Sequence, residues 1–473
     1  MAPANIARII FRESAAWPDK PALVAEDRVL AYGDFVQASG RLAAELERRG
    51  VRPLDRVAFL CADSIDYVLL SLAILSLDAA IVPISPGLML DECATLLEHL
   101  DVRHFLADAA VAPDPAAGDP FQAPDLERTF RFASFAPRRL EPAGYADLRP
   151  AFIRFSSGTT GASKGVVLSH ETILDRTEAA NAGLRIVRDD VVGWVLSMSF
   201  HFVVTILLFL RKGATIVLCG DPLPQALVAA LRAHPLTVLY ASPIHYRLLA
   251  ETAELGPQDF RALRLAVSTA IQLPEAIAQR FYERFGRSLT EAYGIIEVGL
   301  PFIHAPAAGA YDGRLGRPLP AYEIRLADGE VLIRGPGLFD AYFSPWQPQA
   351  DAAPGGWFRT GDLGEIAPDG ELRLLGRRKA VINFSGMKIF PQEVEAVLER
   401  FPDVAEALVY GEPHPEFGQL PQAKLVLREG AGSLDVAALR AFCRGHLAPH
   451  KIPKAFDVVA ALPKTASGKL RRT

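Results

Sequence analysis

The sequence predicts an α/β protein with a large multi-sheet N-terminal domain, a β-rich subdomain within it, and a small α+β C-terminal domain. Three observations support this prediction. Helical and strand-like stretches alternate over the first hundred residues, as in a parallel sheet covered by helices. Short strands separated by turns follow Gly313, and a strand–helix–strand pattern begins at Glu371. With 473 residues, 50% of them hydrophobic, the chain can bury more than one core.

The first part of the chain gives the α/β signal. Apolar spacing and bounding Gly, Pro or Asp residues predict helices at 34–49, 66–77 and 90–100 and strands at 56–60 and 80–84. Residues 109–149 contain prolines, alanines and few periodic apolar positions, which predicts a surface connection. More α/β structure is predicted over 189–218, 226–240 and 263–268.

The last part has a different pattern. Short strands are predicted at 324–326 and 330–333, joined at Asp328-Gly329, a strong hairpin signal. Beyond them we expect strands at 371–375 and 380–383, then helix 391–401, strands 404–410 and 423–427, helix 434–447 and strand 456–460. We place the domain boundary after Gly376, which gives domains 1–376 and 377–473.

Composition excludes several classes of protein. A net charge of -5 and a pI near 6.1 give no basic footprint, so nucleic acid is not an expected partner. The four cysteines are far apart and form no C-x-x-C pair, which fits a reducing cytoplasm. The most apolar window, residues 67–84, contains Asp78 and Pro83 and is better explained as a buried helix followed by a strand than as a membrane span.

The stretch from Phe155 to Gly165 predicts a phosphate-binding loop. Its glycines allow backbone N–H groups to face an anion, Ser156, Ser157, Thr159 and Thr160 add hydroxyls, and Lys164 adds a mobile positive charge. A Gly/Ser surface turn remains the alternative on these residues alone.

Two other known motifs overlap these residues, and the sequence disfavours both. The loop is not a Walker A motif, because Ser163 replaces the required glycine before the lysine. Residues 161–165 match the G-x-S-x-G nucleophile elbow of serine hydrolases, which needs a following helix. Here 166–168 is Val-Val-Leu, which favours a strand.

Three further stretches carry candidate chemistry. Tyr293-Gly294 with Glu297 offers an aromatic face for a purine and a carboxylate for Mg²⁺, although a core tyrosine and a surface glutamate are the simpler interpretation. Asp362 can accept ribose hydroxyls, or can belong to a plain turn. Lys469 lies in a basic C-terminal stretch that is either a solvated end or a delivered lysine.

Taken together, these stretches resemble the core motifs of the adenylate-forming superfamily, which includes acyl-CoA and aryl-CoA synthetases, nonribosomal peptide adenylation domains and firefly luciferase. The resemblance runs from about residue 22 to 472. It implies that a carboxylate attacks the α-phosphorus of ATP to give acyl-AMP and pyrophosphate, after which a thiol displaces AMP. It also implies a mobile C-terminal domain, with ATP, Mg²⁺ and either CoA or the phosphopantetheine of a carrier protein as cofactors.

The resemblance assigns roles residue by residue, including Ser156 and Ser157 in the phosphate loop. Thr159, Thr160 and Lys164 would hold the β and γ phosphates, Tyr293 with Gly294 the adenine, Glu297 the Mg²⁺, Asp362 and Arg377 the ribose, and Lys388 the AMP phosphate. Lys469 would be the catalytic lysine, His201 would border the acyl pocket, and Lys379 would be the hinge. On its own, a histidine in so apolar a run is more often a packed core residue.

Several positions depart from the family pattern. Ser163 replaces a proline, Ile296 replaces a threonine next to Glu297, and Ala270-Ile271-Gln272 replaces Gly-Ala-Pro, which places Ala270 near the purine and acyl pocket. Acidic residues usual after Gly376-Arg377 are replaced by Lys379-Ala380. The charged catalytic set remains, so we expect an active enzyme rather than a degenerate nucleotide or acyl binder.

The apolar stretch 202–210 predicts an apolar acid, aromatic or of medium chain length. No aspartate near residue 200 is available for an amino acid's ammonium group. We expect CoA as the acceptor, with an acyl carrier protein as the alternative.

Overall fold

The computed structural model describes residues 4–26, 28–88, 90–111, 118–156, 164–384, 387–415, 417–464 and 470–471. Packing divides the chain into two compact units. Unit 1 comprises residues 1–323 and 333–358, and unit 2 comprises 324–332 and 359–473. The predicted domain boundary after Gly376 separates a fixed part from a rotating part of the chain. It is a different division from these packing units, and it stays a prediction.

The first sheet of unit 1 has eight strands in the order β15-β14-β13-β12-β10-β11-β1-β2. All neighbouring pairs are parallel except β14–β15 and β1–β2 at the two edges. Its strands are β1 (Pro21–Ala25), β2 (Arg28–Ala31), β10 (Val191–Trp194), β11 (Thr215–Leu218), β12 (Val238–Ala241), β13 (Leu265–Ser268), β14 (Leu289–Ile295) and β15 (Gly299–His304).

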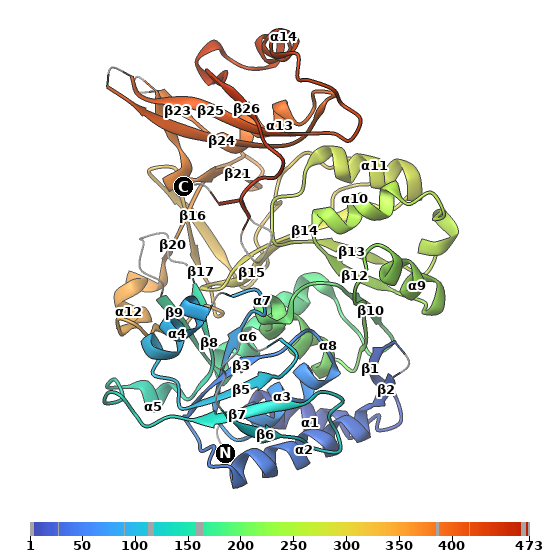
Figure 1. The fold of residues 1–473 in the computed structure, drawn as a ribbon, viewed down its shortest axis with the longest axis vertical. Coiled ribbons are helices and arrows are strands. Elements are labelled where there is room, and N and C mark those ends of the chain that lie inside the picture. Colours follow the sequence, from blue (N-terminus) through green and yellow to red (C-terminus); the bar gives the residue numbers. More distant parts are fainter. Residues whose placement is uncertain are drawn as a thin grey trace. The chain divides into compact units, whose positions relative to one another are not determined.

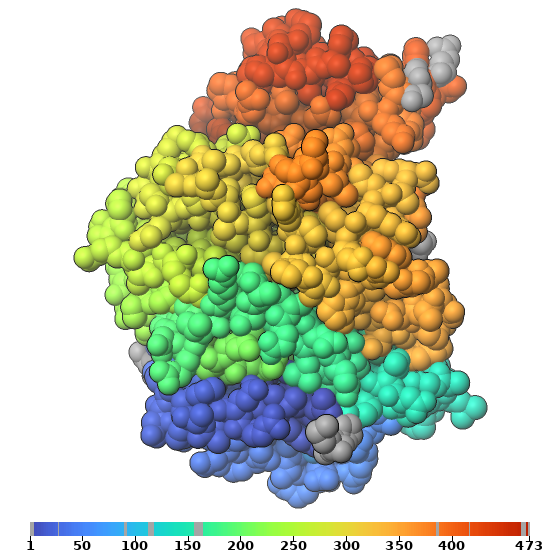
Figure 2. Space-filling view, turned by 180° about the vertical axis from the view of Figure 1, so that it is seen from behind, coloured from blue at the N-terminus to red at the C-terminus, as the bar shows by residue number. Residues whose placement is uncertain are grey.

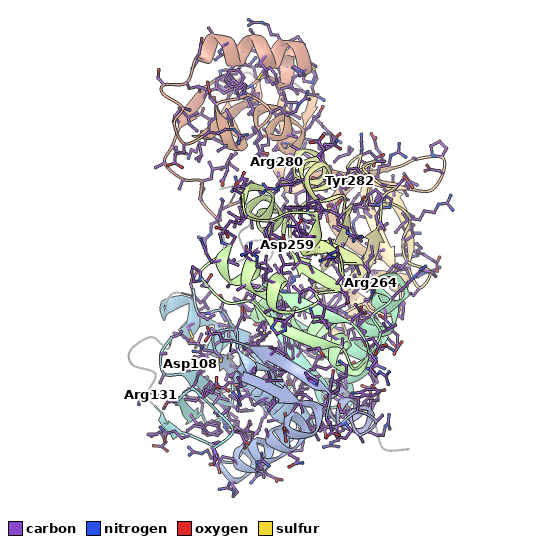
Figure 3. The ribbon with its side chains drawn as sticks, turned by 90° about the vertical axis from the view of Figure 1, so that its right-hand side faces the viewer. Asp108, Arg131, Asp259, Arg264, Arg280 and Tyr282 are labelled. Atoms are coloured by element: carbon purple, nitrogen blue, oxygen red, sulfur yellow. The ribbon has the colours of Figure 1, made fainter. Side chains whose placement is uncertain are left out.

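One carboxylate ties the amino ends of three of these parallel strands. Asp190 lies just before β10 and accepts from Arg264 at 2.5 Å, from the Thr237 hydroxyl at 2.6 Å and from the Val187 N–H at 2.9 Å. Thr237 and Arg264 immediately precede β12 and β13, and Figure 3 shows Arg264 at this edge. The carboxyl ends of these strands, where α/β sheets bind ligands, lie at the opposite end of the strands.

The second sheet of unit 1 has nine strands in the order β19-β18-β9-β8-β4-β3-β5-β7-β6. Its strands are β3 (Arg56–Leu60), β4 (Ala80–Ile84), β5 (His104–Asp108), β6 (Asp119–Phe121), β7 (Phe130–Ser134), β8 (Pro150–Ser156), β9 (Lys164–Ser169), β18 (Ala341–Tyr342) and β19 (Gln347–Pro348). Strands β8 and β9 are antiparallel, with Ser156 opposite Lys164. The strand predicted after the phosphate loop is therefore confirmed, and the nucleophile elbow is excluded.

Helices cover these sheets (Figure 1). Apolar residues of α9–α11 pack on the first sheet, and those of α4 and α5 pack on the second. Helix α3 is buried along nearly all its length, as expected of a helix covered on all sides. The helices of unit 1 are α1 (Ile6–Ser14), α2 (Tyr32–Arg48), α3 (Ile65–Ser76), α4 (Leu90–His99), α5 (Tyr145–Leu148), α6 (His170–Leu184), α7 (Met198–His201), α8 (Leu207–Arg211), α9 (Gln225–Ala233), α10 (Pro243–Glu251), α11 (Glu275–Phe285) and α12 (Gln349–Ala352).

The prediction of a surface connection over 109–149 is wrong. Strand β7 pairs antiparallel with β5, and β6 pairs antiparallel with β7, so both extend the second sheet, and Phe121, Phe130 and Phe132 are buried. A few widely spaced aromatic residues supply the apolar contacts here, and the proline- and alanine-rich composition of the segment did not indicate them. In the described part of the chain, no helix combines the length and apolar character needed to cross a bilayer.

Unit 2 contains two small sheets, in agreement with the predicted β-rich and α+β parts. The sheet β16-β17-β20-β21 includes the hairpin at Asp328-Gly329, whose φ angles of 52° and 77° suit this turn. The second sheet, β23-β22-β25-β24 with β26 on β25, packs against α13 and α14. The elements are β16 (Glu323–Ala327), β17 (Glu330–Arg334), β20 (Phe358–Ile366), β21 (Leu372–Arg377), β22 (Ile382–Phe384), β23 (Met387–Ile389), α13 (Pro391–Leu398), β24 (Val404–His414), β25 (Gly418–Leu427), α14 (Val436–His446) and β26 (Phe456–Val458).

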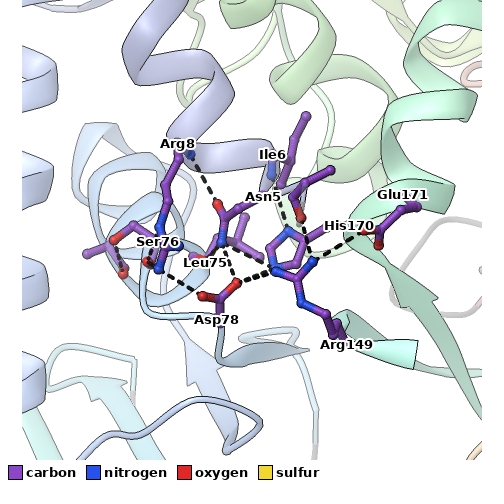
Figure 4. Close-up of polar contacts among 11 residues, drawn as sticks. Asn5, Ile6, Arg8, Leu75, Ser76, Asp78, Arg149, His170 and Glu171 are labelled. Carbon is purple, nitrogen blue, oxygen red and sulfur yellow. Dashed lines mark hydrogen bonds and ion pairs between the residues drawn. The ribbon is translucent and has the colours of Figure 1, made fainter. Parts of the chain in front are cut away.

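A polar network fastens the N-terminal helix to the rest of unit 1 (Figure 4). Asp78 accepts hydrogen bonds from Asn5 at 2.9 Å, Arg149 at 2.8 Å and Arg8 at 2.8 Å. Burial raises the pKa of Asp78, but these partners outweigh it and leave the pKa lowered. His170 is fully buried and accepts from the Ile6 N–H through Nδ1 at 3.2 Å. In Figure 2 the blue N-terminal segment accordingly borders the green segment that contains α6.

The network predicts a loss of stability in acid. Burial lowers the pKa of His170 to about 4, so the imidazole is neutral in the fold but takes up a proton in the unfolded chain below about pH 6.5. Stability is therefore lost as the pH falls from about 6.5 to 4, by at most about 3 kcal/mol for this group. In His170→Gln, whose amide oxygen can accept from Ile6, denaturant unfolding at a series of pH values should show a smaller acid loss. The exposed His99→Gln is the control, and identical pH profiles for wild type and His170→Gln would contradict the prediction.

Candidate active site

The predicted phosphate loop begins at the end of β8 and reaches the start of β9. Ser157, Thr159 and Thr160 lie outside the described residues, as does the side chain of Ser156. Lys164 begins β9, and its Nζ lies 4.3 Å from the centre of the Tyr342 ring. The Tyr342 hydroxyl in turn lies 3.5 Å from Glu297 Oε1. The tyrosine ring therefore lies between the cation of Lys164 and the carboxylate of Glu297.

The backbone at Glu297 is held from two sides. The buried Arg176 donates to Ile296 O at 2.7 Å and to Gly337 O at 2.6 Å, while Phe339 N donates to Glu297 O at 2.8 Å. Glu297 itself is half-buried. One positioned carboxylate beside a phosphate loop fits Mg²⁺, which commonly takes one or two carboxylates together with phosphate oxygens.

The carboxyl ends of β13 and β14 present the predicted purine-binding residues. Tyr293 is half-buried, with its ring 5.9 Å from that of Phe302. A side chain on Gly294 would meet Gly299 O at 2.4 Å, so only glycine fits there. Ala270, two residues after β13, has φ of 76°, a conformation that favours glycine. The departure from glycine at this position therefore introduces local backbone strain.

His201 ends α7, and a π-helical turn, Phe202–Ile206, follows it. The Thr205 hydroxyl donates to His201 O. His201 and Val204 are half-buried, whereas Phe202 and Val203 are buried. Such turns within helices are frequent at functional sites.

Unit 2 brings together the two predicted ribose-binding residues. Asp362 on β20 is opposite Arg377 on β21, and Arg377 Nε lies 2.9 Å from Asp362 Oδ1. Asp362 is buried while Arg377 is more exposed, so the pair joins a fixed carboxylate to an accessible cation. Arg377 also donates to Thr360 O at 2.9 Å.

The predicted hinge residue lies beside a charged cluster in unit 2. Lys379 is exposed in a short 3₁₀ turn, Arg378–Ala380. Its neighbour Arg378 forms an ion pair of 2.8 Å with the buried Glu330, which also binds Arg359 and accepts from Gly361 N at 3.0 Å. Lys388 is exposed on β23, and Lys469 lies outside the described residues.

The comparisons with known proteins agree with these motifs. The family model of the AMP-binding enzyme matches residues 10–343, and that of the AMP-binding enzyme C-terminal domain matches 393–469. The chain belongs to the AMP-binding enzyme family. Its members form acyl-adenylates. The match confirms the predicted adenylate-forming superfamily and the expected enzyme class, an acid–thiol ligase.

Three relatives cover nearly the whole chain. A 3-[(3aS,4S,7aS)-7a-methyl-1,5-dioxo-octahydro-1H-inden-4-yl]propanoyl:CoA ligase of Mycobacterium tuberculosis is 32% identical over 96% of this chain and 95% of that protein. A 3-hydroxybenzoate–CoA ligase of Aromatoleum is 28% identical, covering 96% and 92%. The structure of o-succinylbenzoate CoA synthetase from Bacillus subtilis with its acyl-adenylate aligns with a TM-score of 0.83 and 25% identity, covering 99% and 97%.

Three residues that lie close to predicted site residues were not predicted from the sequence. Tyr342 and Glu330 act through partners far away in the chain, and no local pattern marks them. Arg154 could have been found, because a charged residue interrupts the apolar strand Pro150–Ser156 just before the phosphate loop.

Strain at Ala270 predicts a gain of stability in Ala270→Gly. Relief of the left-handed conformation is worth about 1 to 2 kcal/mol, from which about 0.4 to 1 kcal/mol is subtracted for the greater freedom of glycine in the unfolded chain. We expect a net gain of about 0.5 to 1 kcal/mol in denaturant unfolding. Ala266→Gly, in the buried middle of β13, is the matched control and should destabilise. Equal losses in both variants would show that Ala270 is unstrained.

Proposed function

We propose that this protein activates a carboxylic acid with ATP as its acyl-adenylate and then transfers the acyl group to coenzyme A. The observation that carries the proposal is the alignment of Lys164, Tyr342 and Glu297 at the end of the phosphate-loop hairpin. It joins the predicted binder of the ATP tail to the predicted magnesium ligand. The three CoA ligases described above support the same reaction class.

In the first step, an oxygen of the carboxylate attacks the α-phosphorus of ATP and the bond to pyrophosphate breaks. Negative charge increases on the phosphate oxygens, and positive groups that already face them lower the barrier. Thr159, Thr160 and Lys164 would hold the β and γ phosphates. Glu297 would hold Mg²⁺, which neutralises phosphate charge when bound.

Two sets of predicted residues would bind the nucleoside, one for the adenine and one for the ribose. Tyr293, next to Gly294 on β14, would offer a ring face to adenine, and Ala270 follows the neighbouring strand β13. The carboxylate of Asp362 would accept the ribose hydroxyls, with Arg377 holding that carboxylate in place. Lys388 would approach the AMP phosphate, and Lys469 would stabilise charge between the carboxylate and the α-phosphate.

In the second step, the thiol sulfur attacks the acyl carbonyl and AMP leaves. We propose that the part of the chain after Gly376 rotates about Lys379 between the steps, which removes Lys469 and admits the thiol. The thiol is that of CoA, and the phosphopantetheine of an acyl carrier protein is the alternative acceptor. The four unpaired cysteines fit a reducing cytoplasm.

The acid has a largely apolar acyl part. The turn Phe202–Ile206 after His201 supplies apolar, mostly buried side chains. The relatives named above act on acids of different size, including a dioxo bicyclic propanoate and a hydroxybenzoate. We therefore propose an aromatic, alicyclic or medium-chain acid.

Mass spectrometry of the products tests this function. The protein is offered ATP, Mg²⁺, a panel of such acids and either CoA or a phosphopantetheinylated carrier protein, and AMP, acyl-AMP and acyl-thioester are measured. Lys469→Ala should lower acyl-AMP formation by about 10² to 10³-fold while supplied acyl-AMP still yields thioester. Lys464→Ala, a surface lysine paired with Glu406, is the control. No acid-dependent AMP from wild type would refute the function, and equal loss of both steps would refute the role of Lys469.

Lys379→Pro should separate the two steps. Proline fixes φ and removes the backbone N–H, so it restricts the rotation that the second step requires. We expect acid-dependent pyrophosphate release in a single turnover to persist while thioester formation falls at least about tenfold. Lys379→Ala removes the same charge without the restriction and should keep both steps. An unchanged thioester rate in Lys379→Pro would exclude the hinge assignment.

A further inference from the structure

Arg154 lies on β8, directly before the predicted phosphate loop that begins at Phe155. Side chains of a strand alternate between its two faces. Ile153 and Phe155 pack in the apolar cluster that contains residues of α4, so Arg154 projects from the opposite face of the sheet. A charged side chain on this strand is unusual, because residues 150–153 are all buried.

Arg154 has few partners for its five N–H donors. Its Nη1 donates to Phe200 O at 2.8 Å, and its guanidinium carbon lies 4.8 Å from the centre of the Phe200 ring. No carboxylate among the described residues forms an ion pair with it. Burial lowers the pKa of Arg154 to about 10, although the charge of Glu297 opposes this shift, so the side chain stays cationic at neutral pH. Arg154 is half-buried, and arginines withdrawn from water are normally paired, because removing an unpaired charge from water is unfavourable.

A second polar group without a partner lies nearby. Tyr67 on α3 is fully buried, and its hydroxyl has no hydrogen-bond partner within the described ranges. Its ring packs 5.6 Å from that of Phe202. Burial raises the pKa of Tyr67 while the charge of Arg154 opposes this rise. Arg154 and Tyr67 therefore both contact the stretch Phe200–Phe202, whose central residue is His201.

We propose that Arg154, together with the Tyr67 hydroxyl, binds an oxygen group on the acyl part of the substrate acid, either a keto group or a second carboxylate. The inference rests on the proposed function and makes its substrate class narrower. The apolar turn after His201 accepts the carbon skeleton, while the guanidinium and the phenol supply donors to an acceptor oxygen. Because a buried donor left unpaired is unfavourable, acids without that oxygen should be discriminated against.

The phosphates of ATP are the other source of an anion near Arg154, since this residue lies just before the phosphate loop and interacts electrostatically with Glu297. The two sources predict different kinetic effects. Loss of a contact to the acid changes kcat/KM for the acid and depends on which acid is used. Loss of a contact to ATP raises the KM for ATP equally with every acid.

The experiment measures AMP formation with three series of acids of equal chain length. These are alkanoates of about six to ten carbons, the keto acids that carry a carbonyl on the carbon next to the terminal one, and the corresponding dicarboxylates. Arg154→Met removes the charge at similar volume, Arg154→Lys restores it, and Tyr67→Phe removes only the hydroxyl. Arg131→Met, on the exposed part of β7, is the control (Figure 3). Thermal melting verifies that each variant is folded, and Tyr67→Phe provides the test if Arg154→Met does not fold.

Wild type should prefer a keto acid or dicarboxylate to its alkanoate. Arg154→Met should lower kcat/KM for that oxygenated acid by about 10 to 100-fold, leave the alkanoate and the KM for ATP within about twofold, and be partly rescued by Arg154→Lys. Tyr67→Phe should reduce the same preference less. Equal losses for all acids, a raised KM for ATP, or no preference in wild type would overturn the inference. If wild type forms no AMP with any acid, the proposed function fails, and the inference fails with it.

Discussion

The antiparallel pairing of β8 with β9 is the constraint on which the rest of the site depends. It places Ser156 opposite Lys164 and so determines where the predicted phosphate loop begins and ends. The hairpin is held between β4 and β18, and a side chain on Gly165 would meet Leu100 at 2.5 Å. Gly165 is therefore required by packing against the core, whereas the sequence motif alone suggests a role in the loop.

From this hairpin, two neighbouring strands carry the next contacts. Strand β18 is antiparallel to β9 and brings Tyr342 to Lys164, while Arg176 and Phe339 hold the backbone near Glu297. Hydrogen bonds of this kind hold the backbone that carries the carboxylate in one position before any ligand arrives. Packing within unit 1 therefore fixes the backbone that carries Glu297.

Local patterns predicted much of the fold. Strands β3 and β4 have the predicted bounds because each is a continuous apolar run bounded by charged or turn residues. Strands β6 and β7 could not be predicted in the same way, because their stability comes from the pairing of β7 with β5 and of β6 with β7 across a proline-rich segment. Propensity describes a segment alone, whereas these strands depend on a partner already formed.

The candidate site residues also fall into those that the sequence predicts and those that only the structure reveals. The motif residues could be proposed from sequence, and the structure brings Asp362 to Arg377 and Lys164 near Glu297 through Tyr342. The supporting residues could not be proposed from sequence, because each is defined by contacts between segments far apart in the chain. They are Tyr342, Arg176 and Glu330. The half-buried Arg154 lies between these two cases, because its charge is visible in the sequence, whereas its lack of a carboxylate partner among the described residues is not.

Glu330 has a consequence for attempts to divide the protein. It belongs to residues 324–332, which pack in unit 2 although the chain on both sides of them belongs to unit 1. A fragment that starts at Arg359 would leave behind the strand that carries Glu330, so Arg359 and Arg378 would lose their shared carboxylate. The β17–β20 pairing would be lost with it. Swapping C-terminal parts between relatives would therefore require exchanging this hairpin as well, and a single crossover point would join mismatched halves of one sheet.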